Sequence, residues 1–369
     1  MSTESVAATV REAIANRTRV RISGAATWMN GGRPVLSDTM ISMSSDSGIV
    51  DYVPDDLTIT VRAGTPLSEI AAVTGANGQW LPLDPPGSRS GTIGATIATA
   101  SSGPLAHSFG FARDFVLGLE LVTGKGDVIK SGGRVVKNVA GFDLMRLNCG
   151  AWGTLGVITQ TSLRLYARPK VDRTFALEIP VGANATQPFF HLLRNAPLSA
   201  LTMEGVNGKT AAALGLHAAS VVLIRLAGNE KLVDAQLATL CNIGSPTEVD
   251  ADIWTRLSEQ DPSVPDVALR LSGLPSNAHL LWKNAHTMVE SADAGHLHST
   301  FSKGVVRVAL RGVRDEGLIP APSAAQRVTY EVLPPNAWKA VSPSVTSDAL
   351  SQNVKRAFDP HALFNPGIL

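Results

Sequence analysis

Residues 81–169 read LPLDPPGSRSGTIGATIATASSGPLAHSFGFARDFVLGLELVTGKGDVIKSGGRVVKNVAGFDLMRLNCGAWGTLGVITQTSLRLYARP, and this stretch decides the fold. Short apolar runs alternate in it with turns that contain glycine. Because glycine has no Cβ, it tolerates positive φ and lets another group come close to the backbone. We therefore expect strands joined by loops whose main-chain N–H groups lie against a large flat ligand that carries phosphates.

The composition of the chain excludes some classes of protein. With 369 residues, of which 44% are hydrophobic, it has the length and the apolar content for two domains. Its 32 basic and 31 acidic residues give a net charge of +1, and no basic stripe stands out. We therefore predict no nucleic-acid partner.

Cysteine content and hydropathy limit the redox chemistry and the location of the protein. Cys149 and Cys241 are too few to hold an iron–sulfur cluster, and we expect two reduced thiols. No apolar run reaches the roughly 20 residues of a membrane helix. The N-terminus lacks the charged and then apolar pattern of a signal peptide. The chain is predicted to be cytoplasmic and to reach the inner face of a membrane only through partner subunits.

The N-terminal half predicts small units of strand and helix. Residues 4–16 carry apolar side chains at helical spacing. Residues 116–123 and 128–129 flank a glycine-containing turn, which predicts a hairpin. Thr65 is expected to cap a helix that begins with Pro66. No Gly-x-Gly-x-x-Gly follows a strand, so the pattern is not that of a dinucleotide-binding Rossmann fold.

From residue 171 onward the glycine motifs stop, and strand-like runs alternate with helical patterns. The strand-like runs are 175–179, 221–226, 267–271, 305–310 and 328–333, and the helical patterns are 187–194, 230–240 and 278–290. This mixture predicts an α+β fold with one antiparallel sheet covered by helices. Near the C-terminus, Leu350, Val354 and Phe358 share one face of a further helix.

The order of the motifs carries a family resemblance. The most distinctive ones are KNVAGFDL at residues 137–144 and the C-terminal Asp359-Pro360 with Asn365-Pro366-Gly367. The chain resembles the flavin-binding domain of the vanillyl-alcohol-oxidase / p-cresol-methylhydroxylase (PCMH) superfamily, and within it the E subunits of bacterial glycolate oxidases. The resemblance covers about residues 19–169 and the last twenty or so residues.

The resemblance implies a domain organisation. It assigns a PCMH-type FAD-binding domain to residues 1–172 and an inserted cap domain of substrate type to residues 173–343. Residues 344–369 are expected to return to the FAD-binding domain, which makes that domain a two-part structure.

The turn Ser23-Gly24-Ala25-Ala26-Thr27 is the first candidate FAD contact. Successive N–H groups in a turn of small residues form a concave anion site that suits a pyrophosphate. The alternative is an ordinary tight turn. In the family this loop reads Gly-x-Gly-Ser/Thr, and Ala26 stands at the second glycine. Some relatives hold the flavin covalently through a histidine of this loop, and the loop here has none, so we predict non-covalent FAD.

Other candidate FAD contacts follow from the resemblance, which places them along the ribityl chain, the flavin or the adenine. Their alternative roles are structural: Thr92 as a helix cap, Arg113 and Asp114 as a surface ion pair, and residues 156–158 as a plain buried strand. The contacts are Pro82, Thr92, Ile93, Gly94, Ala95, Thr99, Ser102, Gly103, Gly110, Arg113, Asp114, Gly156, Val157 and Ile158.

Lys137 is a further candidate, because a cation near the N1/O2 edge stabilises a reduced flavin. The alternative is a solvated lysine.

A catalytic base is missing from the pattern. Relatives that oxidise 2-hydroxy acids by themselves carry a His-Gly-Asp-Gly-Asn-x-His segment that sets a metal and a base. The nearest feature here is Gly295-His296-Leu297-His298, whose histidines we interpret as ordinary strand residues rather than zinc ligands. His107 could face the flavin, and the alternative is a hydrogen-bonded loop histidine. We therefore assign no metal site and no catalytic residue.

Three functions remain open at this point. The resemblance favours an FAD-binding subunit of a multi-subunit 2-hydroxy-acid (glycolate) oxidase. With a homologous catalytic flavin subunit, it would pass electrons toward an iron–sulfur subunit and quinone. The second function is a self-sufficient FAD-dependent D-2-hydroxy-acid dehydrogenase of the D-lactate type. The third is a docking subunit with an empty flavin pocket.

Overall fold

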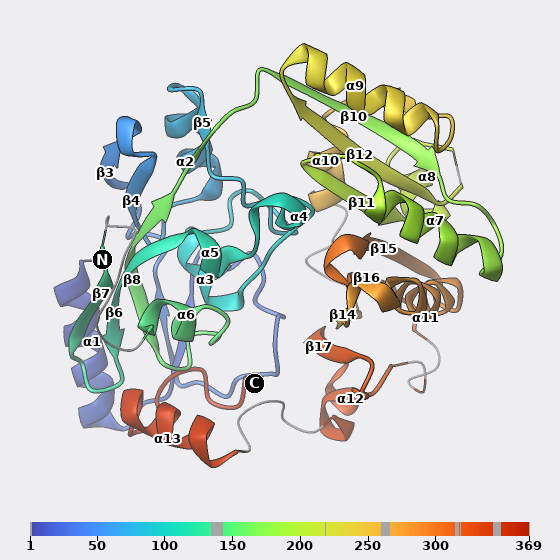
Figure 1. The fold of residues 1–369 in the computed structure, drawn as a ribbon. Coiled ribbons are helices and arrows are strands. Elements are labelled where there is room, and N and C mark those ends of the chain that lie inside the picture. Colours follow the sequence, from blue (N-terminus) through green and yellow to red (C-terminus); the bar gives the residue numbers. More distant parts are fainter. Residues whose placement is uncertain are drawn as a thin grey trace. The chain divides into compact units, whose positions relative to one another are not determined.

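The computed structural model describes residues 2–133, 143–217, 219–259, 266–313, 317, 319–341 and 348–368. The chain divides into two compact units (Figure 1). Unit 1 comprises Met1–Ser102, Gly110–Arg168 and Trp338–Leu369, and unit 2 comprises Gly103–Phe109 and Pro169–Ala337. The domain boundaries expected at residues 172 and 343 stay a prediction.

Unit 1 is built on a five-stranded antiparallel sheet. Its strand order is β3-β4-β8-β6-β7. The pairing of β6 with β7 confirms the predicted hairpin. The strands are β3 (Ile49–Val53), β4 (Thr58–Arg62), β6 (Val116–Thr123), β7 (Val128–Gly132) and β8 (Gly156–Arg164).

Smaller elements complete unit 1. A parallel pair joins β1 (Val20–Ser23) to β2 (Thr39–Ser42), and an antiparallel pair joins β5 (Gln79–Trp80) to β9 (Tyr166–Ala167). The helical segments are α1 (Thr3–Asn16), η1 (Pro54–Asp56), α2 (Leu67–Gly75), α3 (Ile93–Thr99), α5 (Ala112–Phe115), α6 (Leu144–Asn148) and α13 (Ala349–Phe358).

Helix α1 shows how the sequence pattern sets the packing. Ser2 caps it by accepting a hydrogen bond from Ser5 N; Val6, Val10 and Ala13 are buried, and Ile14 is partly buried. They pack in one cluster with Val122 of β6 and Phe364 near the C-terminus. The first strands and the last residues of the chain therefore share a single core.

The predicted cap of α2 is wrong. The residue that precedes α2 is Pro66, which makes no side-chain capping bond. The Thr65 hydroxyl instead exchanges hydrogen bonds with the backbone of Gly48, at 3.0 and 3.1 Å. A tertiary contact therefore uses the hydroxyl that the local pattern assigned to the helix.

Unit 2 is built on an eight-stranded sheet in the order β13-β10-β12-β11-β15-β16-β14-β17. Every pairing in it is antiparallel, so the predicted α+β class with an antiparallel sheet is confirmed. The strands are β10 (Val171–Glu178), β11 (Thr202–Val206), β12 (Val221–Gly228), β13 (Thr247–Val249), β14 (Val267–Ser272), β15 (Ala294–Thr300), β16 (Val305–Arg311) and β17 (Arg327–Val332).

Helices cover both faces of this sheet. Gly205 of β11 lies against Trp282 of α11, so its neighbours Glu204 and Val206 point to the opposite face. On that face Val206 belongs to an apolar cluster with residues of α8 and α10. The helical segments are α4 (Ala106–Phe109), α7 (Ala183–Asn195), α8 (Gly208–Ala213), α9 (Glu230–Cys241), α10 (Ile253–Glu259), η2 (Pro275–Asn277), α11 (Ala278–Glu290), η3 (Phe301–Lys303) and α12 (Pro335–Ala340).

Two strands of unit 2, β11 and β13, were not predicted from the sequence pattern. β11 reads TMEGV and is buried along its whole length, so it shows no alternation, and Glu204 interrupts its apolar run. β13 has only three residues, of which two are exposed. Among the described residues, no helix has the length and apolar character needed to cross a membrane.

His107 of α4 lies in unit 2, and its Nδ1 is 2.6 Å from the hydroxyl of Ser302. Burial, together with the nearby Lys303 ammonium, lowers the pKa of His107 to about 4. The predicted hydrogen bond of His107 is therefore present, but the residue lies in a short helix and not in a loop.

We expect unit 2 to lose stability on acidification because of His107. Its pKa is about 4 in the folded state and 6.5 in a model peptide, so only the unfolded chain binds the proton between these values. The free energy of unfolding should fall by about 1–2 kcal/mol between pH 6.5 and pH 5 from this group and be flat above pH 7. Chemical denaturation at several pH values measures this.

The control for this prediction is a second histidine. His107→Gln keeps a group that can bind Ser302 and should flatten the acid limb of the stability curve, whereas His361→Gln on an exposed position should leave it unchanged. Identical curves for His107→Gln and wild type would refute the assignment.

Candidate functional site

The turn Ser23–Thr27 follows directly from β1, whose last residue pairs with Ser42 of β2. Ala26 has a φ of +56°, a conformation that glycine adopts far more easily, and it occupies the position where the family has glycine. The buried hydroxyl oxygen of Ser23 has no hydrogen-bond partner in the part of the chain that the structure describes. A buried hydroxyl in this position can donate to an anion.

The turn meets the start of α3. A Cβ at Gly24 would overlap the Thr92 hydroxyl and would come within 3.2 Å of the Ala95 side chain. The Thr92 hydroxyl also accepts a hydrogen bond from Ala95 N at 3.4 Å, so the predicted alternative of a helix cap is realised. The structure therefore brings together two sequence-predicted segments, residues 23–27 and 92–95, and only glycine allows their approach at position 24.

Helix α3 packs on the end of β4 through a second glycine. A Cβ at Gly94 would lie 2.8 Å from both the Cβ and the carbonyl oxygen of Ala63. The Gly94 N–H donates to that same carbonyl at 2.9 Å. Ile93 is fully buried beside it, and the Thr99 hydroxyl donates to Ala95 O at 2.8 Å. The Thr99 side chain thus already has an intrahelical partner.

Residues 156–158 open β8 in the middle of the sheet. They pair with β6, where Gly156 lies opposite Thr123 and Ile158 opposite Leu121. The ladder from β8 to β4 begins only at Gln160, so none of the described strands pairs with the second edge of residues 156–158. Val157 is fully buried in the core of unit 1. Its side chain is structural, and only the backbone of this segment is placed to meet a ligand.

The remaining predicted contacts show structural roles or lie elsewhere. The Asp114 carboxylate accepts a hydrogen bond from Phe111 N at 2.8 Å and lies 4.0 Å from Arg113, so the predicted alternative of an exposed ion pair is present. Pro82 is buried, and Gly110 has a φ of +86° beside Asp114. Ser102 ends one segment of unit 1, whereas Gly103 begins a segment of unit 2. Lys137 lies outside the described residues.

These segments fit an anionic, flat cofactor. The Ser23 hydroxyl is buried without a partner among the described residues, and residues 24–27 are half-buried or exposed where the turn meets the start of α3. The turn and the open edge of residues 156–158 are both main-chain surfaces, which suits contact with a pyrophosphate and a ring system. The described residues of the site supply no base to the turn itself.

A polar row crosses the sheet of unit 2 (the cap row: Glu204, His298, Thr300, Arg307, Arg270 and Glu331). Glu204 is fully buried, and its carboxylate lies 2.6 Å from His298 Nδ1 and accepts from the Thr300 hydroxyl at 2.8 Å. On the next strand Arg307 lies opposite His298. Glu204 therefore fixes the imidazole ring through one nitrogen.

The cap row continues through two arginines that share one carboxylate. Arg307 and Arg270 lie opposite each other on β16 and β14, and both contact Glu331, with Nε–Oε distances of 2.8 and 2.9 Å. Burial would raise the pKa of Glu331, but the two guanidiniums outweigh it and hold the pKa below its usual value. At Glu331 two guanidiniums face one carboxylate, so Arg270, Arg307 and Glu331 together carry more positive than negative charge.

Sequence reasoning missed this row, although a pattern was available. Glu204 and Arg270 are the single charged residues of the mainly apolar strands β11 and β14, and Arg307 and Glu331 each share their strand with one further charged residue at its end. A charged side chain is rarely placed in such a strand without a buried partner. His296 and His298 do lie in a strand, as predicted, and the described residues contain no group of three side chains that could hold a metal ion.

A cavity of about 350 Å³ lies on the same face of β15. His296 lines it, together with Arg256 of α10 and Arg311 of β16. Burial, and the positive charge of Arg311, lowers the pKa of His296, so this ring is neutral at pH 7. Glu259 also lines the cavity, so its polar lining combines two guanidiniums, one carboxylate and a neutral imidazole.

Comparison with known proteins identifies the family. A family model described as an FAD binding domain matches residues 1–132. Glycolate oxidase subunit GlcE of Escherichia coli (strain K12) is 31% identical over 372 residues, which cover 97% of this chain and 94% of that protein. The chain belongs to the GlcE family. This GlcE-family chain is therefore an FAD-binding protein of an oxidoreductase family, as predicted.

Other relatives of this GlcE-family chain are hydroxy-acid enzymes. D-2-hydroxyglutarate dehydrogenase of Xanthomonas citri pv. viticola is 27% identical over 418 residues, which cover 100% of this chain and 87% of that protein. Glycolate oxidase subunit GlcD of Bacillus subtilis (strain 168) is 34% identical over 152 residues, which cover 41% of this chain and 32% of that protein.

Solved structures confirm the PCMH-type fold of the GlcE-family chain. p-Cresol methylhydroxylase with substrate bound matches 100% of this chain and 87% of its own, with a TM-score of 0.72 and 14% identity. Alkyldihydroxyacetonephosphate synthase matches 99% of this chain and 75% of its own, with a TM-score of 0.70 and 16% identity. At these identities the likeness concerns the fold alone.

We expect Gly94→Ala to destabilise unit 1, because its Cβ would lie 2.8 Å from Ala63 backbone and side-chain atoms. Overpacking of this kind costs roughly 1–3 kcal/mol, which exceeds the ~1 kcal/mol that alanine gains over glycine in a helix. Gly133→Ala is the matched control, since no atom of the described residues lies within 4 Å of its added Cβ. Thermal unfolding without added ligand measures both, and equal stabilities would contradict the packing argument.

Proposed function

We propose that the chain is the FAD-binding subunit of a multi-subunit glycolate oxidase. The observation that carries the proposal is the similarity to a glycolate oxidase subunit along nearly the whole chain. A protein similar in that way shares both the FAD-binding region and the inserted second unit. The partners are a homologous flavin subunit, similar to glycolate oxidase subunit GlcD, and an iron–sulfur subunit.

The residues of unit 1 would hold FAD through the backbone. The N–H groups of residues 24–27 and the Ser23 hydroxyl would bind the pyrophosphate, and the segments at 92–95 and 156–158 would lie along the rest of the cofactor. Bound FAD supplies a two-electron acceptor. The turn contains no histidine, cysteine or tyrosine, which favours non-covalent attachment.

Electrons would have to leave the chain through its partners. Burial raises the pKa of the Cys149 thiol to about 12, and Cys241 is exposed in α9, so neither is arranged as a cluster ligand or a redox pair. The iron–sulfur subunit would therefore carry the clusters and deliver electrons to quinone. The hydroxy acid would be oxidised only by the assembled complex of this chain and its partner subunits.

One observation favours a second function, a self-sufficient dehydrogenase of D-2-hydroxy acids. His298 is held through Nδ1 by the buried Glu204, which leaves Nε2 as the nitrogen that can accept a proton. Such an arrangement is that of a general base with an orienting carboxylate. A D-2-hydroxyglutarate dehydrogenase matches the full length of the chain, which agrees with this reading.

We expect the purified chain to take up added FAD and to show the absorption of oxidised flavin. Acid precipitation should release the flavin into the supernatant, because the attachment is non-covalent. Flavin that stays with the pellet would overturn the non-covalent assignment. A chain that takes up no FAD would overturn the proposed function and favour a docking subunit.

The two enzymatic functions differ in what glycolate and D-lactate do to the isolated, FAD-loaded chain. As a subunit of a complex, it should keep oxidised flavin with either acid until the partner subunits are added. Rapid bleaching of the isolated chain would instead establish the self-sufficient dehydrogenase. In that case His298→Gln should slow bleaching roughly 100-fold or more, and His361→Gln should not.

A further inference from the structure

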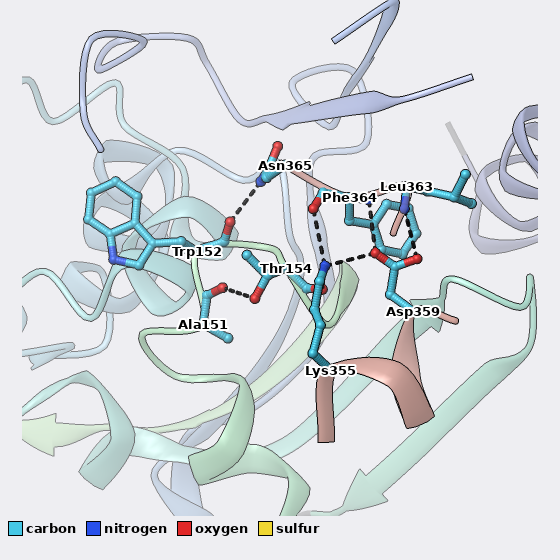
Figure 2. A network of polar contacts seen from close by, with 8 residues as sticks. All are labelled: Ala151, Trp152, Thr154, Lys355, Asp359, Leu363, Phe364 and Asn365. Carbon is cyan, nitrogen blue, oxygen red and sulfur yellow. Dashed lines mark hydrogen bonds and ion pairs between the residues drawn. The ribbon is translucent and has the colours of Figure 1, made fainter. Parts of the chain in front are cut away.

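The C-terminal segment makes a compact polar network with the core of unit 1, the C-terminal clasp (Lys355, Asp359 and Asn365; Figure 2). We infer that Asn365 is a positioning residue for FAD, which fixes the turn at residues 23–27 relative to the loop that leads into β8. This inference rests on the proposed FAD-binding function. It assigns a role to a residue that lies far from those segments in the sequence.

The first part of the clasp is the Asp359 carboxylate. It is 2% exposed and accepts hydrogen bonds from Leu363 N and Phe364 N, at 2.9 and 3.0 Å. Lys355 of α13 contacts the same carboxylate at 2.8 Å. A Cβ at Gly124 would lie 2.5 Å from Asp359 Oδ1, so glycine is required where the β6–β7 turn meets the clasp. The carboxylate thus folds the tail into a fixed loop.

Lys355 extends the clasp to the loop before β8. Its ammonium group donates to Thr154 O at 2.7 Å and to Phe364 O at 3.3 Å. The Thr154 hydroxyl in turn donates to Ala151 O at 2.7 Å. Figure 2 shows these groups converging from α13, the tail and the loop. The loop at residues 151–154 is therefore held from the C-terminal side.

Asn365 is the part of the clasp that joins two predicted FAD segments. Asn365 is only 3% exposed. Its Oδ1 accepts a hydrogen bond from Ile22 N at 2.8 Å, and its Nδ2 donates to Trp152 O at 2.7 Å. Ile22 directly precedes Ser23, and Trp152 directly precedes the glycine-containing entry to β8. A carboxamide supplies a donor and an acceptor at once. The N–H of Ile22 requires the oxygen on its side, and the carbonyl of Trp152 requires the NH2 group on the other.

Backbone conformation shows how closely the amide is fitted. Trp152 and Asn365 have φ values of +52° and +40°, which are strained for residues other than glycine and are favoured only modestly by asparagine. Gly153, with φ +68°, would place a Cβ 2.8 Å from Asn365 Nδ2. Trp152 N also donates to Ala98 O of α3 at 2.8 Å. Through Trp152, the amide of Asn365 thus connects β1, the β8 loop and α3.

The two hydrogen bonds of the Asn365 side chain end at backbone atoms next to the FAD segments. Neither bond ends at a predicted cofactor contact. Loss of the amide should therefore loosen the relative position of the segments. The consequence is a weaker cofactor complex in a chain that still folds, because the backbone bonds of the tail, such as Asn365 N to Val20 O at 2.9 Å, remain.

The first variant is Asn365→Gly, which tolerates the positive φ and removes only the side chain. We expect its dissociation constant for FAD, measured by flavin fluorescence, to rise roughly tenfold or more from the loss of two buried hydrogen bonds. Asn207→Ala is the control, because it removes a buried helix-capping asparagine of unit 2. The control should lower thermal stability and leave the FAD dissociation constant at the wild-type value.

The second variant, Asn365→Asp, adds a pH signature. Its carboxylate can still accept from Ile22 N, but it faces the Trp152 carbonyl and cannot donate until it is protonated. The ratio of its FAD dissociation constant to that of wild type, measured at the same pH, should fall toward one as the pH decreases from 8 to 5. A role in overall folding alone would give no such recovery of affinity.

The outcomes separate the inference from the proposed function. Wild-type protein that binds no FAD overturns the proposed function and the role of Asn365 with it. FAD uptake by wild type with unchanged dissociation constants in the Asn365 variants overturns the positioning role alone. If Asn365→Gly does not fold, the pH dependence of Asn365→Asp decides, and a ratio that stays constant with pH overturns the inference.

Discussion

Unit 1 depends on hydrogen bonds between the first strand and the last residues of the chain. Val20 N donates to Leu363 O at 2.8 Å, and Asn365 N donates back to Val20 O at 2.9 Å. The buried Asp359 carboxylate keeps the tail in the conformation that makes these bonds possible. The glycines at positions 24 and 94 then allow α3 to lie directly against the turn that follows β1 and the end of β4. The proposed cofactor surface is therefore a product of backbone packing rather than of reactive side chains.

Unit 2 has the opposite character. Its sheet buries two carboxylates and a guanidinium that are less than a tenth exposed, and transfer of such groups from water is costly unless each finds a partner. Every member of the cap row does find one, through His298, Thr300 or the pair of arginines on Glu331. Apolar residues would have packed a sheet at less cost. The stability of the sheet alone therefore does not account for these charges.

The sequence predicted what alternation and glycine can encode. The β6–β7 hairpin, helices α1, α9 and α11, and the antiparallel sheet follow from periodicity, because those side chains pack on one face of a regular element. Elsewhere tertiary contacts overrode the local sequence patterns. Thr65 bonds to Gly48 instead of capping α2, and β11 is buried on both faces and so shows no alternation. The meeting of residues 23–27 with 92–95 and the partners of Glu204 are long-range contacts, which no local pattern contains.

The bond between Asn365 and Ile22 spans 343 positions of the chain. During synthesis the N-terminal strand leaves the ribosome long before its partner exists, so unit 1 cannot finish folding until residue 365 has been made. Unit 2, whose segments after residue 169 are contiguous as far as Ala337, is free to fold earlier. Unit 2 can therefore complete its fold before unit 1, and synthesis that stops before residue 365 would leave a folded unit 2 and an unfinished unit 1.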